Sequence, residues 1–181
     1  MDNYIFRKRK ALDHRTCDHI INKFLQYDPV WNERHYYVIC PSLSDTNFLF
    51  LKPILTKYTD EYKEKHRFLN SKYNPNPYYS SWDITEHFNI QKYDPGEFYA
   101  FGEHCEHGSG EKDSKRILAW MIYLNDIKYK GGTCWPQQNF TSKPRAGDLY
   151  IWPAGWTHSH YGIPAPKETK YIITGWCSYY G

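Results

Sequence analysis

The chain has 181 residues, of which 23 are basic and 20 acidic, and its formal net charge is +3. This length fits one domain with a substantial core, and so balanced a charge gives no strong signal for nucleic-acid binding. The negative mean hydropathy and the lack of a long apolar run argue against a membrane-spanning helix.

The chain starts MDNYIFRKRK, which has no apolar stretch of the kind found in signal peptides. Its five cysteines are an odd number, and none are spaced as Cys-x-x-Cys; they are Cys17, Cys40, Cys105, Cys134 and Cys177. This pattern favours free thiols in a reducing compartment over a disulfide framework. We therefore expect a cytoplasmic protein.

The first 77 residues read as mainly helical. Apolar residues recur at helical spacing over 13–27, with Asp13 or Thr16 as N-cap candidates. A second stripe predicts a helix over 45–68, where Pro53 belongs to an early turn or kinks the helix. Residues 70–77 are rich in turn formers and break the pattern.

From Tyr78 onward, short aromatic and β-branched runs alternate with Pro/Gly turns. The expected strands lie at 81–93, 97–106, 115–124, 132–135, 138–143, 148–152, 156–162 and 170–179. So many short strands in about 100 residues indicate a sandwich, jelly roll or barrel. Helices followed by strands predict an α+β domain in which residues 1–77 support a β core over 78–181.

Two distant segments carry residues suited to binding a metal. His104 and Glu106 are two apart, so on a strand both face one side, and Cys105 faces the other. A third ligand would come from His158 or His160, which are also two apart, and spacing alone does not choose between them. Two imidazoles and one carboxylate form the facial triad of non-heme Fe(II) oxygenases, although catalytic zinc uses His₂Glu sites as well.

Lys170 begins an apolar Tyr-Ile-Ile run ten residues after His160. If this strand returns beside the histidine strand, its ammonium points into the β core. Since a buried lysine is costly without an anion, a ligand carboxylate is a reasonable partner.

Together these motifs resemble the 2-oxoglutarate/Fe(II)-dependent dioxygenases, specifically the prolyl 4-hydroxylase-like branch. They run in order through Tyr93-Asp-Pro-Gly, His104-Cys-Glu, Arg116-Ile-Leu-Ala-Trp-Met-Ile-Tyr-Leu-Asn, Gly131-Gly-Thr, Pro144-Arg-Ala-Gly, His160-Tyr-Gly-Ile-Pro, Lys170 and Trp176. The resemblance implies that the N-terminal helices pack on a double-stranded β-helix (jelly-roll) core. The His-Cys-Glu version is similar to proteins of bacteriophages and marine bacteria, which implies a host cytoplasm if the protein is phage-encoded.

The resemblance also implies the roles of individual residues. The intervals from the distal histidine to Pro164 and Lys170 match His160, so His104, Glu106 and His160 would bind the metal. Lys170 would hold the distal carboxylate of 2-oxoglutarate, with Tyr93 and Tyr123 lining that pocket. The family usually has Asp where this chain has Glu106; a shifted reading puts Gly102 and His104 in the His and Asp places and loses the carboxylate.

The implied cofactors and co-substrates are Fe(II), 2-oxoglutarate and O₂, with ascorbate as an additional candidate. The implied reaction hydroxylates a C–H bond, with a prolyl residue in a peptide or protein as the favoured substrate. Free amino acids, other protein side chains and modified nucleobases are alternative substrates. A non-catalytic or zinc-binding jelly-roll module and a zinc hydrolase are the alternatives of a different class.

Trp152 and Trp156 are candidates for the pocket wall, Trp176 is expected in the core, and the loop from Glu106 to Arg116 is placed to act as a lid.

Overall fold

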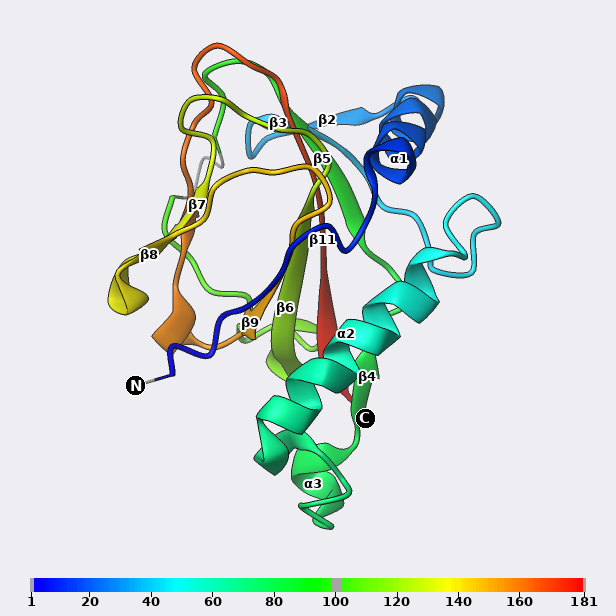
Figure 1. Cartoon of the computed structure of the whole chain (residues 1–181), viewed down its shortest axis with the longest axis vertical. Coiled ribbons are helices and arrows are strands. Elements are labelled where there is room, and N and C mark those ends of the chain that lie inside the picture. Colours follow the sequence, from blue (N-terminus) through cyan, green and yellow to red (C-terminus); the bar gives the residue numbers. More distant parts are fainter. Residues whose placement is uncertain (1, 99–101, 181) are drawn as a thin grey trace.

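The computed structural model describes residues 2–98 and 102–180 (Figure 1). The helices in this part of the chain are α1 (His14–Gln26), α2 (Leu51–Lys65) and α3 (Pro77–Ser80), with short 3₁₀ turns η1 (Arg67–Leu69), η2 (Asp113–Lys115), η3 (Pro136–Gln138) and η4 (Trp156–His158). The strands are β1 (Phe6–Lys8), β2 (Val30–Asn32), β3 (Tyr36–Ile39), β4 (Trp82–Ile84), β5 (Asn89–Tyr93), β6 (Arg116–Tyr123), β7 (Thr133–Trp135), β8 (Phe140–Thr141), β9 (Leu149–Pro153), β10 (Tyr161–Gly162) and β11 (Lys170–Tyr179). No helix in the described ranges is long and apolar enough to cross a membrane.

The strands form a larger and a smaller antiparallel sheet. The larger has eight strands in the order β1-β9-β6-β11-β5-β3-β2, with β4 also paired to β11, and the smaller has the order β10-β7-β8. In Figure 1 the smaller sheet lies on the side of the larger one that faces away from α1 and α2. The structure is therefore a mixed, mostly antiparallel β fold with few helices.

Both faces of the larger sheet are buried, and strand β6 shows how. Its side chains alternate between two buried clusters, as expected for the two-residue period of a strand. Leu118, Trp120 and Ile122 belong to a cluster that also contains α1 and α2 residues such as Phe24 and Leu55. The alternate residues Ala119, Met121 and Tyr123 belong to a cluster with β7 and β9. The site described below lies on this second face.

Local sequence explains where the two long helices begin. Asp13 caps α1 by accepting a 2.7 Å hydrogen bond from the backbone N–H of Thr16, which distinguishes it from the other cap candidate. Helix α2 begins at Leu51 rather than near residue 45, and residues 45–50 form turns instead. Pro53 then falls in the first turn of α2, where its missing N–H would have no helical partner.

The structure corrects four expectations about strands. Residues 81–93 are not one strand, because β4 ends at Ile84 and β5 begins at Asn89. The first 77 residues are not only helical, because β1, β2 and β3 join the larger sheet. Residues 156–162 are not one strand, since η4 precedes the two-residue β10. The expected strand at 97–106 is also absent from its described part, where His104 makes an isolated bridge; residues 99–101 lie outside the described residues.

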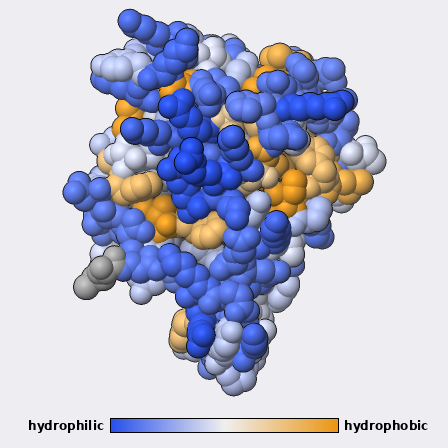
Figure 2. Space-filling view, in the orientation of Figure 1, coloured by the Kyte–Doolittle hydropathy of each residue, from blue (hydrophilic) through white to orange (hydrophobic). Residues whose placement is uncertain are grey.

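Figure 2 shows one face of the molecule as largely hydrophilic, with hydrophobic residues in separate patches.

Candidate functional site

The structure joins two distant histidines through their backbones. The N–H of His104 donates to the carbonyl of His160 at 3.0 Å, and the reciprocal bond measures 2.8 Å. This bridge sets the two imidazoles side by side, with ring centroids 4.6 Å apart. Nδ1 of His104 lies 2.9 Å from the carbonyl oxygen of Gly102, and Nδ1 of His160 lies 3.0 Å from the carbonyl oxygen of His158. Since a carbonyl only accepts, Nδ1 carries the proton and Nε2 keeps a lone pair for a ligand.

Glu106 completes the group. Its Oε1 lies 3.7 Å from Nε2 of His104 and 3.4 Å from Nε2 of His160. One ligand atom from each residue can be chosen so that all three lie within 4.8 Å of one another. Ions with bonds of about 2.1 Å hold their ligand atoms at similar spacings, so the three side chains are placed to share one ion.

The electrostatics of the group reflect this convergence. Burial alone would raise the pKa of Glu106, but hydrogen bonds and charge from the two histidines outweigh it and lower the pKa. Burial disfavours charge on His104, yet hydrogen bonding and charge from Glu106 raise its pKa overall. The carboxylate therefore stays ionised, as a metal ligand requires.

The second oxygen of Glu106 has a different partner. Its Oε2 accepts a 2.7 Å hydrogen bond from the indole Nε1 of Trp176, and Nη1 of Arg116 lies 3.7 Å away. Trp176, which was expected in the core, is partly buried: it packs against the second core cluster and also lines a cavity next to Glu106. The sequence carried no signal for this contact, because the two residues are 70 positions apart.

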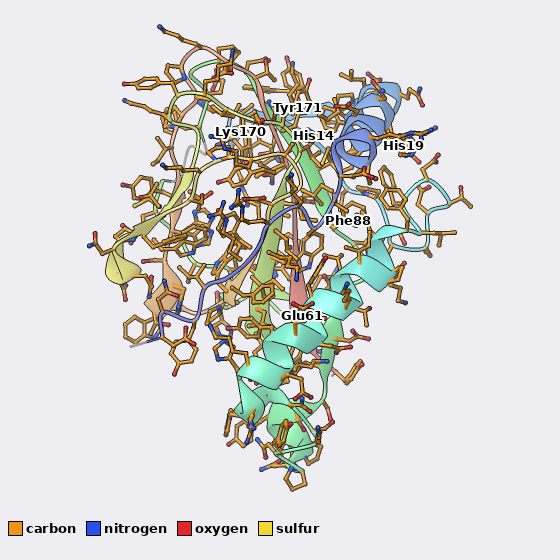
Figure 3. All side chains as sticks on the ribbon, viewed as in Figure 1. His14, His19, Glu61, Phe88, Lys170 and Tyr171 are labelled. Atoms are coloured by element: carbon orange, nitrogen blue, oxygen red, sulfur yellow. The ribbon has the colours of Figure 1, made fainter. Side chains whose placement is uncertain are left out.

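The cavity has a volume of about 560 Å³ and contains all three residues of the candidate metal group. Lys170 also lines it, from the first position of β11, paired with Tyr93 of β5. Its neighbour Tyr171 faces the opposite side of the sheet, against Phe24 of α1. Figure 3 labels Lys170 and Tyr171 at this end of β11.

Lys170 is a buried cation. It is only 4% exposed, and its Nζ lies 4.7 Å from the centroid of the Tyr93 ring. No carboxylate of the described ranges 2–98 and 102–180 lies within 4.0 Å of this nitrogen. Burial therefore lowers the pKa of Lys170 to about 8. A cation in this state favours binding of an anion from solution.

Both expected tyrosines line the cavity. The Tyr123 hydroxyl makes hydrogen bonds with Oγ1 of Thr133 at 3.0 Å and Oγ of Ser142 at 2.7 Å. The Tyr93 hydroxyl donates to Oε1 of Gln91 at 3.0 Å, so Tyr93 presents its ring, not its hydroxyl, to the Lys170 ammonium. Of these partners, only Thr133 belonged to a motif that could have indicated it, Gly131-Gly-Thr.

Four other candidates lie outside the metal group. His158 is buried in η4, with Nε2 3.0 Å from the carbonyl oxygen of Asn3, so the structure brings His160 and not His158 to His104 and Glu106. Cys105 points its thiol to the carbonyl of His107 at 3.2 Å. Trp152 does line the cavity, whereas Trp156 is 74% exposed at the surface.

Solved structures share this fold at low sequence identity. A viral collagen prolyl hydroxylase from Paramecium bursaria Chlorella virus 1, solved with 2-oxoglutarate, is 18% identical, with a TM-score of 0.78 over 99% of this chain and 97% of its own. A Pseudomonas putida prolyl-4-hydroxylase is 12% identical, with a TM-score of 0.72 over 98% and 94% of the two chains. A Trichoplax adhaerens prolyl hydroxylase, solved with a hypoxia-inducible-factor peptide fragment, is 17% identical, with a TM-score of 0.66 over 97% and 84%.

No curated protein has a significantly similar sequence. The sequence model of the 2OG-Fe(II) oxygenase superfamily, however, matches residues 88–178, just over half of the chain. That match includes the two histidines, Glu106 and Lys170, and it does not favour the alternative of a non-catalytic or zinc-binding module. The chain belongs to the 2OG-Fe(II) oxygenase superfamily, whose enzymes use Fe(II), 2-oxoglutarate and O₂.

Proposed function

We propose that this enzyme hydroxylates a prolyl residue in a peptide or protein, with His104, Glu106 and His160 as its Fe(II) ligands and Lys170 as the anchor for 2-oxoglutarate. One observation carries the proposal: a convergent His/Glu/His group lines the same cavity as a buried lysine that has no acidic partner among the described residues. When bound, Fe(II) supplies the activation of O₂, coupled to conversion of 2-oxoglutarate to succinate and CO₂.

The chain's own contribution at the metal is preorganisation. The carbonyls of Gly102 and His158 fix the tautomer of the two imidazoles, so both Nε2 atoms face Glu106 before any ion arrives. The donor set of two neutral imidazoles and one carboxylate suits Fe(II) and leaves coordination positions open for a co-substrate. Gly102 offers no side chain, so the ligand set with Glu106 is the better fit to the site.

The chain's contribution at the co-substrate is charge and shape. The Lys170 ammonium would pair with the distal carboxylate of 2-oxoglutarate, replacing the water that the buried cation lost on folding. Tyr93 packs against the ammonium with its ring, and the Tyr123 hydroxyl, already joined to Thr133 and Ser142, would orient toward the same carboxylate.

Support for a prolyl substrate comes from the fold shared with three prolyl hydroxylases, one of them solved with a peptide. We also propose that residues 1–181 form a single dioxygenase domain, in which α1 and α2 support the sheet face opposite the cavity. The loop from Glu106 to Arg116 is our candidate for a lid, since several of its residues, including His107, Gly108 and Lys112, line the cavity.

The test begins with turnover of 2-oxoglutarate by purified protein. Succinate should form only with Fe(II) and O₂, and a library of proline-containing peptides, followed by mass spectrometry, should then show addition of one oxygen atom. Glu106→Ala should abolish both products, whereas Cys105→Ala should retain them, because the Cys105 thiol contacts the carbonyl of His107 and is not part of the group. Zinc binding without any succinate would refute the proposal.

A further inference from the structure

The two oxygens of Glu106 have separate partners. Oε1 faces the imidazoles of His104 and His160, at 3.7 and 3.4 Å, while Oε2 accepts the Trp176 indole N–H at 2.7 Å. Only one oxygen therefore points toward the place where an ion would be shared. The other is committed to the wall of the cavity.

The Trp176 indole N–H is a hydrogen-bond donor at every physiological pH. An indole N–H donates only and does not titrate in the physiological range, so its preference for an acceptor is permanent. A hydrogen bond to an ionised carboxylate is stronger than one between neutral groups. This bond consequently favours attachment of Glu106 to a metal through one oxygen, and opposes rotation of the carboxylate that would bring Oε2 to the ion.

Trp176 is held by a regular strand and by a neighbouring cation. Trp176 lies in β11, opposite Ala119 of β6, and its ring stacks beneath the Arg116 guanidinium at 3.8 Å. Arg116 in turn bonds the Glu106 carbonyl at 3.1 Å and pairs with Asp113 at 3.0 Å. Glu106 belongs to an irregular segment outside the strands. The Glu106 backbone is anchored by its N–H bond to the Ala154 carbonyl at 3.0 Å, and Trp176 adds orientation of the carboxylate itself.

We propose that Trp176 is a positioning residue for metal binding, whose N–H holds Glu106 with a single oxygen toward the ion. The inference rests on the proposed function, because it takes Glu106 as a metal ligand. Glutamate has one more rotatable bond than aspartate and so loses more freedom when it is fixed. Without the indole, the carboxylate would have to be ordered when the ion binds, and that cost would weaken metal binding.

Metal affinity tests this role without relying on turnover. Mn(II), a redox-inert probe, is titrated into metal-free protein, and the free ion is followed by electron paramagnetic resonance. Trp176→Phe keeps a ring beneath Arg116 but removes the donor, so the dissociation constant should rise about 10–100-fold, the usual effect of losing a group that orients a ligand. Trp120→Phe is the matched control, because in the described part of the chain its indole nitrogen has no hydrogen-bond partner and its side chain belongs to the buried cluster on the opposite face of the sheet; it should stay within about threefold of the wild type.

The Glu106→Gln variant tests whether the effect of Trp176→Phe on Mn(II) affinity changes direction when residue 106 is no longer a carboxylate. In Glu106→Gln, the amide oxygen would ligate and the NH₂ group would face the indole, placing two donors together. Adding Trp176→Phe to that background should leave Mn(II) affinity unchanged or improve it. The inference is overturned if Trp176→Phe binds Mn(II) within about threefold of the wild type, or if it weakens binding equally in both backgrounds.

A measurement on the wild type covers the case in which Trp176→Phe does not fold. The indole proton of Trp176, assigned by nuclear magnetic resonance through the β11 backbone, should exchange slowly with water in the Zn(II)-loaded protein. Fast exchange would overturn the inference. Failure of the proposed function looks different: Glu106→Ala would then bind Mn(II) as tightly as the wild type, whatever the behaviour of the Trp176 variants.

Discussion

Replacing Lys170 with methionine should stabilise the protein without ligand and destroy its affinity for 2-oxoglutarate. Methionine fills a similar volume but carries no charge. Burial lowers the pKa of Lys170 from 10.5 to about 8, which corresponds to about 3 kcal/mol of unfavourable free energy in the folded state at neutral pH. Loss of the ammonium contact with the Tyr93 ring returns about 1–2 kcal/mol, so Lys170→Met should gain about 1–2 kcal/mol.

With 2-oxoglutarate bound, the wild type should be more stable than Lys170→Met. Loss of a buried ammonium–carboxylate contact costs about 3–5 kcal/mol, so the dissociation constant for 2-oxoglutarate should rise about 10²–10³-fold. At a concentration 100 times its dissociation constant, 2-oxoglutarate should add about 2.7 kcal/mol to the wild type, while Lys170→Met gains almost nothing.

Urea unfolding with and without 2-oxoglutarate and Mn(II) measures both effects. Lys167→Met, an exposed lysine in the preceding loop, is the control and should change neither quantity. The reasoning would be refuted if unliganded Lys170→Met were less stable than the wild type by more than about 1 kcal/mol, a cost expected of a packing defect rather than of a removed charge. It would equally fail if the variant bound 2-oxoglutarate with unchanged affinity.

Three further predictions concern pH and folding. The affinity for 2-oxoglutarate should fall as pH rises through about 8, because the free site then loses the Lys170 proton, and calorimetric titration between pH 7 and 9 would detect it; a flat profile contradicts the assignment. The stability of the unliganded wild type should rise between about pH 8 and 10.5, since only the unfolded state keeps that proton there, and the rise should be missing in Lys170→Met. Gly147→Ala should prevent folding, because its φ is +80° and a Cβ atom would lie 1.9 Å from the Leu12 carbonyl oxygen, whereas Gly155→Ala has open space and should melt normally; soluble, cooperatively melting Gly147→Ala would contradict this account.

One stability prediction tests the N-terminal strand. Arg7 of β1 bonds the carboxylate of Asp148 through Nε at 3.1 Å and Nη2 at 2.7 Å, and the Asp148 side chain is only 2% exposed. Arg7→Ala should lower the free energy of unfolding by about 1–3 kcal/mol, because it leaves a buried carboxylate without its cation. Lys8→Ala removes a pair exposed on both sides and should cost under about 1 kcal/mol. Equal losses in urea unfolding would contradict this difference.

The sequence predicted the parts of the site that depend on local spacing. His104 and Glu106 converge although no regular strand contains them, because the bridge to His160 fixes His104 and the N–H of Glu106 bonds the Ala154 carbonyl at 3.0 Å. Spacing alone could not choose His160 over His158. A 3₁₀ turn replaces the expected strand there and turns His158 toward Asn3. The family intervals to Pro164 and Lys170 indicated His160 for a reason that local periodicity does not contain.

Contacts between distant segments set the limit of sequence reasoning. The bond from Trp176 to Glu106 depends on the register of β11 with β6, which no local pattern encodes. Residues 36–39 did carry the signature of a strand, in Tyr-Tyr-Val-Ile, but their pairing with β5 requires the tertiary fold. The late start of α2 likewise reflects turn formation by Asp45, whose Oδ1 accepts from the Asn47 backbone at 2.9 Å.

The most direct test of the central claim is an anaerobic titration of 2-oxoglutarate into the Fe(II)-loaded protein, followed by visible absorption. Chelation of 2-oxoglutarate by ligated Fe(II) should produce a charge-transfer band in the wild type. The band should persist in Cys105→Ala, disappear in His160→Ala and Glu106→Ala, and require far more 2-oxoglutarate in Lys170→Met. A band of full intensity in His160→Ala or Glu106→Ala would contradict the account, because the metal would then be bound elsewhere.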